Sequence, residues 1–203
     1  MLTARTRLKV ALLCGVAVIV GLAVFAFKRY NEAIDDPTAI VAPPEYVDAA
    51  TKIAKLRNQH RFDDAVSVGL HSLTGKRDDF IFQMIATVYF VRALADKDHA
   101  GQWTKLAAEY SAKALDANPT DLANVFNVGM NYMVAGDDLD TGGCEYYRRA
   151  LAIFNSLSPR LHDNRAQTQG RRVRLAPFRK RNEDELSRVR GRLRHCQPPP
   201  YGR

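Results

Sequence analysis

An uninterrupted apolar run near the N-terminus constrains this chain more than any other feature of its sequence. Residues 10–27 read VALLCGVAVIVGLAVFAF. Basic residues flank the run on both sides, with Arg5, Arg7 and Lys9 before it and Lys28 and Arg29 after it. At about 1.5 Å per residue, a helix of this length would measure about 27 Å, close to the roughly 30 Å hydrocarbon core of a bilayer. We therefore predict that residues 1–30 form a membrane anchor with a single span at residues 10–27.

A cleaved secretory signal is the alternative interpretation of this N-terminus. Such signals carry an apolar stretch of about 7 to 15 residues, followed by small residues at the cleavage site. The run here is longer, and Phe25 and Phe27 stand where small residues would be needed, so we favour an uncleaved anchor. Basic residues are slightly more numerous before the span than after it, which favours a cytoplasmic N-terminus. We expect a single-pass protein of a bacterial inner membrane with an extracytoplasmic main domain.

The chain that follows the anchor is predicted to fold into one all-α domain. Prolines at positions 37, 43 and 44 mark residues 31–44 as an extended linker, because each disfavours helix at the residue before it. From residue 45 to residue 158 the apolar residues recur every three or four positions, and no segment shows the sustained alternation of a strand. Helices are expected at residues 45–58, 62–73, 79–94, 102–117, 121–135 and 143–157.

These helices form pairs, and the third pair has the clearest internal pattern. Gly129 and Tyr132 lie on its first helix, Tyr147 and Ala150 lie on its second, and Pro119 closes the preceding pair. This arrangement resembles the tetratricopeptide repeat, in which paired helices stack into a solenoid. The turns near residues 96–101 and 137–142 are predicted to be longer than in that family. An unrelated array of six helices is the alternative interpretation.

The resemblance implies a concave groove lined by the first helix of each pair, where a partner segment binds. Carried over to this chain, the groove positions are Gln83, Thr87, Phe90, Phe126, Met130 and Met133. The sequence lacks the Lys and Asn set with which some family members hold a terminal carboxylate. We therefore expect an apolar helix or strand as the partner, with simple core packing of these side chains as the alternative.

The basic residues are concentrated in a C-terminal tail, residues 159–203. Residues 156–203 hold 13 Lys and Arg against 4 Asp and Glu, a net charge of +9, whereas the whole chain carries +8. Asn182 followed by an acidic run predicts the start of a short helix near residues 183–194. This helix would cap the apolar face of the third pair. The alternative is a polyanion-binding arm for anionic lipid or nucleic acid, whose residues would be Arg171, Arg172, Arg174, Arg179, Lys180 and Arg181.

Nucleic acid is the less favoured of these partners because the tail has few aromatic residues with which to stack bases. Cysteine is scarce, and outside the apolar run only Cys144 and Cys196 are present. If the domain faces an oxidising compartment, these two residues can form one disulfide that ties the tail to the helical domain. Two unpaired cysteines are the alternative.

No arrangement typical of a catalytic or metal site is evident in the sequence. The chain has no HExxH, CxxC, P-loop or Gly-x-Ser-x-Gly motif. Its five histidines show no metal-ligand spacing: His60, His71, His99, His162 and His195. We therefore expect no catalytic residues, no metal and no cofactor. The predicted function is that of a membrane-anchored scaffold or assembly subunit that binds a protein of a membrane-associated complex.

Overall fold

The computed structural model describes residues 42–139, 142–162, 167–168, 171–172 and 175–196. All of them belong to one compact unit, Pro37–Arg203. Its α-helices are α2 (Val47–Asn58), α3 (Phe62–His71), α4 (Asp78–Ala95), α5 (Ala100–Ala117), α6 (Leu122–Asp138), α7 (Gly143–Arg160) and α8 (Leu175–Arg194). Short 3-10 helices lie at η1 (Pro44–Tyr46) and η2 (Lys97–His99), and two antiparallel two-residue strands at β1 (Gln167–Thr168) and β2 (Arg171–Arg172).

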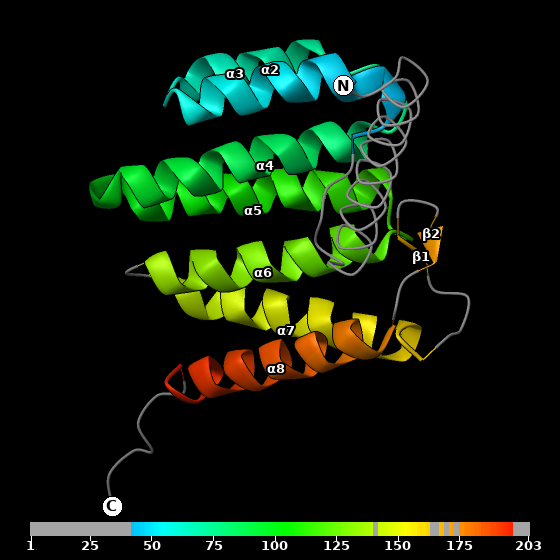
Figure 1. Ribbon diagram of the computed structural model, residues 1–203. Helices are drawn as coiled ribbons and strands as arrows, with labels where there is room; N and C mark the ends of the chain where they lie inside the picture. Colours follow the sequence, from blue (N-terminus) through cyan, green and yellow to red (C-terminus); the bar gives the residue numbers. More distant parts are fainter. Residues whose placement is uncertain (1–41, 140–141, 163–166, 169–170, 173–174, 197–203) are drawn as a thin grey trace, which may run out of the picture. The chain divides into compact units, whose positions relative to one another are not determined.

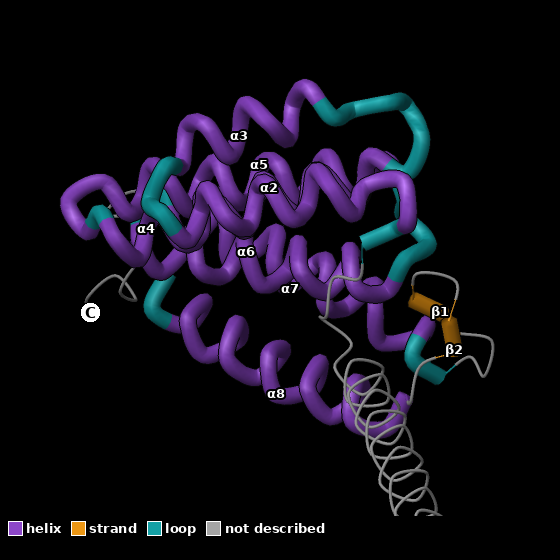
Figure 2. Tube along the Cα trace, turned by 45° about the horizontal axis from the view of Figure 1, so that its top comes forward, coloured by secondary structure: helices purple, strands orange, loops and turns teal. Residues whose placement is uncertain are grey.

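The helices of this unit are packed in successive pairs, which confirms the predicted all-α class. Helices α2 and α3, α4 and α5, and α6 and α7 lie side by side as three pairs in sequence order, and α8 packs on α7 (Figure 1). In the second view the helices again account for almost all of the described backbone (Figure 2). The packing is consistent with a helical-repeat fold. The predicted span at residues 10–27 lies outside the described residues, and no helix within them is long and apolar enough to cross a membrane.

The starts of α6 and α7 follow from local chemistry in the turns that precede them. Asp121 caps α6, because its carboxylate accepts hydrogen bonds from the backbone N–H groups of Ala123 (2.8 Å) and Asn124 (3.1 Å). Helix α7 begins after Gly142, whose φ of 84° is a left-handed conformation that glycine adopts without strain. The predicted boundaries of α2 to α7 fall close to the observed ones.

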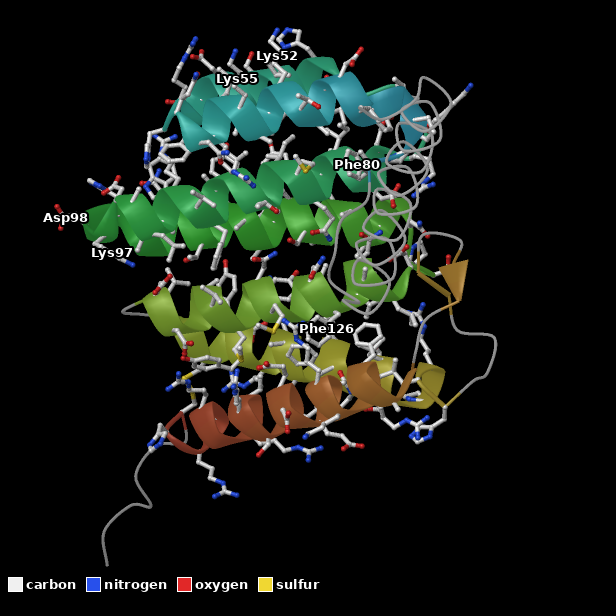
Figure 3. The ribbon with its side chains drawn as sticks, in the orientation of Figure 1. Lys52, Lys55, Phe80, Lys97, Asp98 and Phe126 are labelled. Carbon is white, nitrogen blue, oxygen red and sulfur yellow. A yellow bond between two sulfur atoms is a disulfide. The ribbon has the colours of Figure 1, made fainter. Side chains whose placement is uncertain are left out.

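Two apolar clusters form the core, one at each end of the stack. The first joins the α2–α3 pair to α4 through Tyr46, Ile53 and Ile85. The second joins α6 and α7 to α8, and its centre is Phe126, which contacts the rings of other helices (Figure 3). In this cluster the backbone of α6 also lies close to side chains of α7. A Cβ added to Gly129 on α6 would lie 2.6 Å from a ring carbon of Phe154 on α7.

The joint between the second and third pairs is more polar than either cluster. Asp79, buried in the first turn of α4, accepts hydrogen bonds from the amides of Asn118 and Asn124, each at 3.2 Å. Small side chains, among them Ala107 and Ala108, are buried along α5. The network links the first turns of α4 and α6 to the C-terminal end of α5. These hydrogen bonds offset the cost of burying the carboxylate.

Helix α8 begins well before the position predicted from the sequence. Asn182 is not an N-cap but a buried residue inside the helix, and its amide donates to the carbonyl of Phe154 (3.3 Å) and to Ser158 Oγ (2.9 Å). The core-facing stripe of α8 therefore starts at Phe178 and includes a polar residue. Through this stripe α8 covers the apolar face of the α6–α7 pair.

Two further expectations differ from the structure. The turn predicted at residues 96–101 is short, because α4 extends to Ala95 and α5 already begins at Ala100, with η2 between them. Helix α7 continues through Pro159 to Arg160 instead of ending at Leu157. A proline removes the hydrogen bond to the carbonyl four residues earlier. Here that carbonyl belongs to exposed Asn155, where water can replace the lost donor.

Candidate partner-binding groove

A groove with a volume of about 550 Å³ is lined by the first helix of every pair and by α8. On α2, α4 and α6 the lining residues are adjacent or lie three or four positions apart, so one face of each contributes, and α8 adds a single residue. They are Ala54 and Arg57 of α2; Gln83, Met84, Thr87 and Phe90 of α4; Asn127, Met130, Asn131 and Val134 of α6; and Arg181 of α8. The groove is thus a product of the stacking of the pairs, not of one helix.

Gln83 occupies an unusual position in the lining of the groove. Its side chain is only 3% exposed, and its Nε2 makes no hydrogen bond. The neighbouring Thr87 hydroxyl donates to the Gln83 backbone carbonyl at 2.9 Å, an intrahelical bond that leaves the amide unpaired. A buried donor without an acceptor costs about 1 to 3 kcal/mol. Because Nε2 itself is buried, an acceptor on a ligand would recover that energy only after the Gln83 side chain rotates toward the groove.

The charged residues that line the groove are both cationic. Arg57 lies on the first helix of the stack and Arg181 lies on the last, and no carboxylate is among the lining residues. Arg57 donates to Asn58 Oδ1 at 3.2 and 3.3 Å, which orients its guanidinium. The Arg181 guanidinium lies over the Phe126 ring, 5.1 Å from its centroid. Both guanidinium groups therefore already have partners within the described residues.

Four of the six residues predicted to bind a partner are together in this groove. Gln83, Thr87, Phe90 and Met130 line it. The other two are core residues instead, because Phe126 is 0% exposed and Met133 is 7% exposed. On α6 the groove-facing residues are shifted by one position from those predicted, and one residue corresponds to a rotation of about 100° around a helix. The two side chains consequently face α7 and α8.

The prediction missed the polar residues of the groove. Asn127 and Asn131 lie four residues apart on a mostly apolar helix, and Asn131 donates to Ser111 of α5. That spacing of two amides on one helical face is the signal that sequence reasoning could have used. Arg57 and Arg181 could not be found in this way, because only the stacking of α2 and α8 brings them to the same surface.

The residues proposed for polyanion binding do not form one surface in the described part of the chain. Arg179, Lys180 and Arg181 are consecutive on α8, so their side chains point in different directions. Arg179 donates to the Leu161 carbonyl at 3.4 Å, and Arg181 packs on an aromatic ring, whereas Lys180 is exposed. The side chains of the remaining three, Arg171, Arg172 and Arg174, lie outside the described residues.

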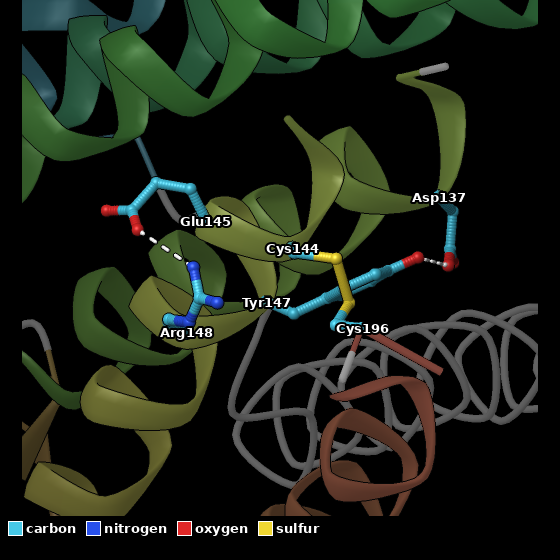
Figure 4. Close-up of a disulfide and its surroundings, with 6 residues drawn as sticks. All are labelled: Asp137, Cys144, Glu145, Tyr147, Arg148 and Cys196. Carbon is cyan, nitrogen blue, oxygen red and sulfur yellow. Dashed lines mark hydrogen bonds and ion pairs between the residues drawn. A yellow bond between two sulfur atoms is a disulfide. The ribbon is translucent and has the colours of Figure 1, made fainter. Parts of the chain in front are cut away.

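A disulfide joins Cys144 of α7 to Cys196, just beyond α8, with 5.6 Å between their Cα atoms (Figure 4). Next to it, the Tyr147 hydroxyl donates to Asp137 Oδ1 at 2.7 Å, and Arg192 pairs with the same carboxylate at 3.0 Å. Burial and this hydrogen bond raise the pKa of Tyr147 to about 12. The C-terminal end of α8 is therefore fixed to α6 and α7 by covalent and polar contacts.

The described residues contain no group of three or more His, Cys, Asp or Glu side chains that could hold a metal ion. Comparison of the chain with protein-family models, with curated proteins and with solved structures gives no match. The geometry of the groove is accordingly the basis on which a function can be proposed.

Proposed function

We propose that this protein is a membrane-anchored, non-catalytic interaction module that holds a segment of a partner protein in the groove formed by α2, α4, α6 and α8. The observation that carries the proposal is the buried, unpaired amide of Gln83 in the lining of a groove to which every helical pair contributes. A folded chain retains such a donor at a cost to its stability, which an acceptor on a bound partner offsets once the side chain rotates toward it.

The arrangement of the pairs supports a tetratricopeptide-like solenoid as the scaffold of this module. Successive helix pairs in contact with their neighbours expose the first helices on one surface, the one used for binding in solenoid proteins. Met84 and Met130 in the lining also fit a binding surface, because the flexible thioether adapts to different side chains. We infer that the module acts as an accessory or assembly subunit of a membrane complex.

The apolar run at residues 10–27 would anchor the module, with the helical domain outside the cytoplasm of a bacterial cell. The Cys144–Cys196 disulfide favours this side of the membrane, because such bonds persist in oxidising compartments. A reporter enzyme that is active only outside the cytoplasm, fused after Arg203, tests the orientation. We expect activity with this reporter. Activity only with a cytoplasmic reporter would reverse the assigned topology.

Photo-crosslinking in intact membranes tests the proposed function. The crosslinker benzoylphenylalanine would replace Thr87 in the groove or, as a matched control, the exposed Asn155 on the second helix of the third pair. We expect one protein to be crosslinked from position 87 in high yield and not from position 155. Equal yields from the two positions, or no crosslinked protein from position 87, would refute binding in the groove.

A further inference from the structure

A second groove, with a volume of about 580 Å³, lies where α5 meets α6 and α7. It shares no lining residue with the partner-binding groove. Its lining consists of Lys105, Glu109, Ala112, Lys113 and Asp116 of α5, Tyr132 of α6, and Tyr146 and Arg149 of α7. We call it the tyrosine groove, because its aromatic residues are the two tyrosines.

The two tyrosines of this groove are held in a fixed arrangement. Their rings meet edge to face, with centroids 5.9 Å apart. The Arg149 guanidinium lies 5.6 Å from the centroid of Tyr146 and 6.0 Å from that of Tyr132, and it is itself held by Glu145 at 3.1 Å. Both tyrosines remain partly exposed. Aromatic-lined grooves of this kind are surfaces on which proline-rich segments pack.

The tyrosine groove also offers hydrogen-bond donors that are available to a ligand. The Tyr146 hydroxyl makes no hydrogen bond with the described residues and is accessible to solvent. Lys105 is exposed and has no ion pair among the described residues. Proline has a backbone carbonyl but no N–H, so a run of prolines brings acceptors without donors. The groove and such a run are therefore complementary.

The chain itself supplies a run of this kind directly after Cys196. Residues 197–203 read QPPPYGR, and consecutive prolines favour the extended polyproline II conformation. The disulfide fixes the start of this segment 5.6 Å, between Cα atoms, from Cys144 in the first turn of α7, two residues before Tyr146. At about 3.1 Å per residue, residues 197–201 span about 15 Å, more than the diameter of a helix with its side chains, about 10 to 12 Å. The segment can therefore reach from Cys144 to the tyrosine groove.

We propose that residues 198–201 of this chain dock in the tyrosine groove. The prolines pack on the two tyrosines, and their carbonyls accept hydrogen bonds from the Tyr146 hydroxyl and Lys105. The exposed carboxylates of Glu109 and Asp116 in the lining complement the charge of Arg203. Because the tether gives a millimolar effective concentration, a contact too weak to hold separate molecules together is sufficient. The docked segment keeps other proline-rich segments out of this groove, a role that goes beyond the proposed function and does not depend on it.

Photo-crosslinking of the full-length protein in detergent micelles locates the segment. Benzoylphenylalanine would replace Tyr201, and mass spectrometry would identify the crosslinked peptides. A mixture of isotopically labelled and unlabelled protein separates links within one molecule from links between two. We expect links within one molecule to residues 105–116 or 146–149. Links only to other parts of the chain, links mainly between two copies, or no links would overturn the proposal.

Matched tryptophan variants test whether the groove itself is required. Ala112→Trp fills the tyrosine groove and should lower the crosslinking yield about ten-fold, because a released segment loses its effective concentration at the site. Ala95→Trp adds the same ring at an exposed position outside the lining and should leave the yield unchanged. Equal yields in the two variants would overturn the proposal. Circular dichroism checks that both variants are folded.

A competition experiment tests the same contact without a change in the folded helices. In the full-length variant with Pro198→Ser, Pro199→Ser and Pro200→Ser, the groove should be open to a synthetic peptide of residues 197–203. Fluorine NMR of protein labelled with fluorotyrosine follows the Tyr146 signal, assigned by its absence in Tyr146→Phe, as the peptide is added to millimolar concentration. We expect the peptide to bind the serine variant about ten-fold more tightly than the unmodified protein.

Two other results would contradict self-docking. Equal affinities for the serine variant and the unmodified protein, or no shift of the Tyr146 signal in either, would show that the segment does not occupy the groove. In intact membranes, crosslinks from position 201 mainly to another protein would assign the segment to that partner instead. The partner-binding groove is not altered in these variants, so either result would leave the proposed function standing.

Discussion

Removal of the Cys144–Cys196 disulfide should destabilise the helical domain by a measurable and calculable amount. The two cysteines are 52 residues apart in the sequence. Applied to a loop of this length, the chain-entropy relation gives about 4 kcal/mol, the upper end of the usual 2 to 4 kcal/mol for one disulfide. Because the Arg192–Asp137 ion pair and the packing of Leu193 also hold this end of α8, the native fold should persist without the bond.

Urea unfolding and thermal melts, both followed by circular dichroism, would compare the full-length protein with a Cys144→Ser, Cys196→Ser variant. For a domain of this size, each kcal/mol lowers the melting temperature by about 2 to 4 °C, so we expect a decrease of roughly 8 to 16 °C. A reducing agent should reproduce the decrease in the unmodified protein and have no effect on the variant. Cys14→Ser is the matched control and should leave stability unchanged. A difference below about 1 kcal/mol between the oxidised protein and the variant would refute the entropic reasoning.

Three further perturbations test the packing and the electrostatics of the fold. Gly129→Ala should cost about 1 to 3 kcal/mol because its Cβ would overlap an aromatic ring, whereas Gly191→Ala, with open space around it, should stabilise α8 by about 0.5 to 1 kcal/mol; thermal melts distinguish the two. Asp79→Ala should cost about 1 to 3 kcal/mol in urea unfolding, because two asparagine amides at the joint between pairs lose their acceptor. The raised pKa of Tyr147 implies a stability contribution of about 3 kcal/mol that is complete below pH 10 and is lost as the pH rises toward 12. Tyr147→Phe should flatten that decrease in alkaline melts, and an unchanged slope would contradict the raised pKa of Tyr147.

The periodicity of apolar residues was sufficient to predict α2 to α7, because each of these helices buries one stripe against its neighbours. Helix α8 shows where this reasoning fails. Its core-facing stripe contains Asn182, which hydrogen-bonds to groups of α7. A polar residue at a buried position looks like a helix cap in the sequence, and only the tertiary contact distinguishes the two.

The residues of the groove were predictable only in part, because tertiary contacts decide which face of α6 is exposed. Positions transferred from the repeat family placed Gln83 and Thr87 on the correct face of α4, but on α6 they included Phe126, which is buried. A shift of one residue changes the exposed face, and local periodicity does not determine that phase when a helix is apolar on most sides. Arg57 and Arg181 come to the same groove only through the stacking of helices that are far apart in the sequence.

Hydrogen–deuterium exchange tests the central claim most directly, because it distinguishes the first helices of the pairs from the second. The full-length protein would be measured alone and with a saturating concentration of a peptide selected from a random library for binding that a Thr87→Trp substitution abolishes. A segment bound in the groove should slow exchange in α2, α4 and α6 and leave α3, α5 and α7 largely unchanged. Slower exchange confined to α3, α5 and α7, on the opposite side of the pairs, would contradict the claim that the stacked first helices form the binding site.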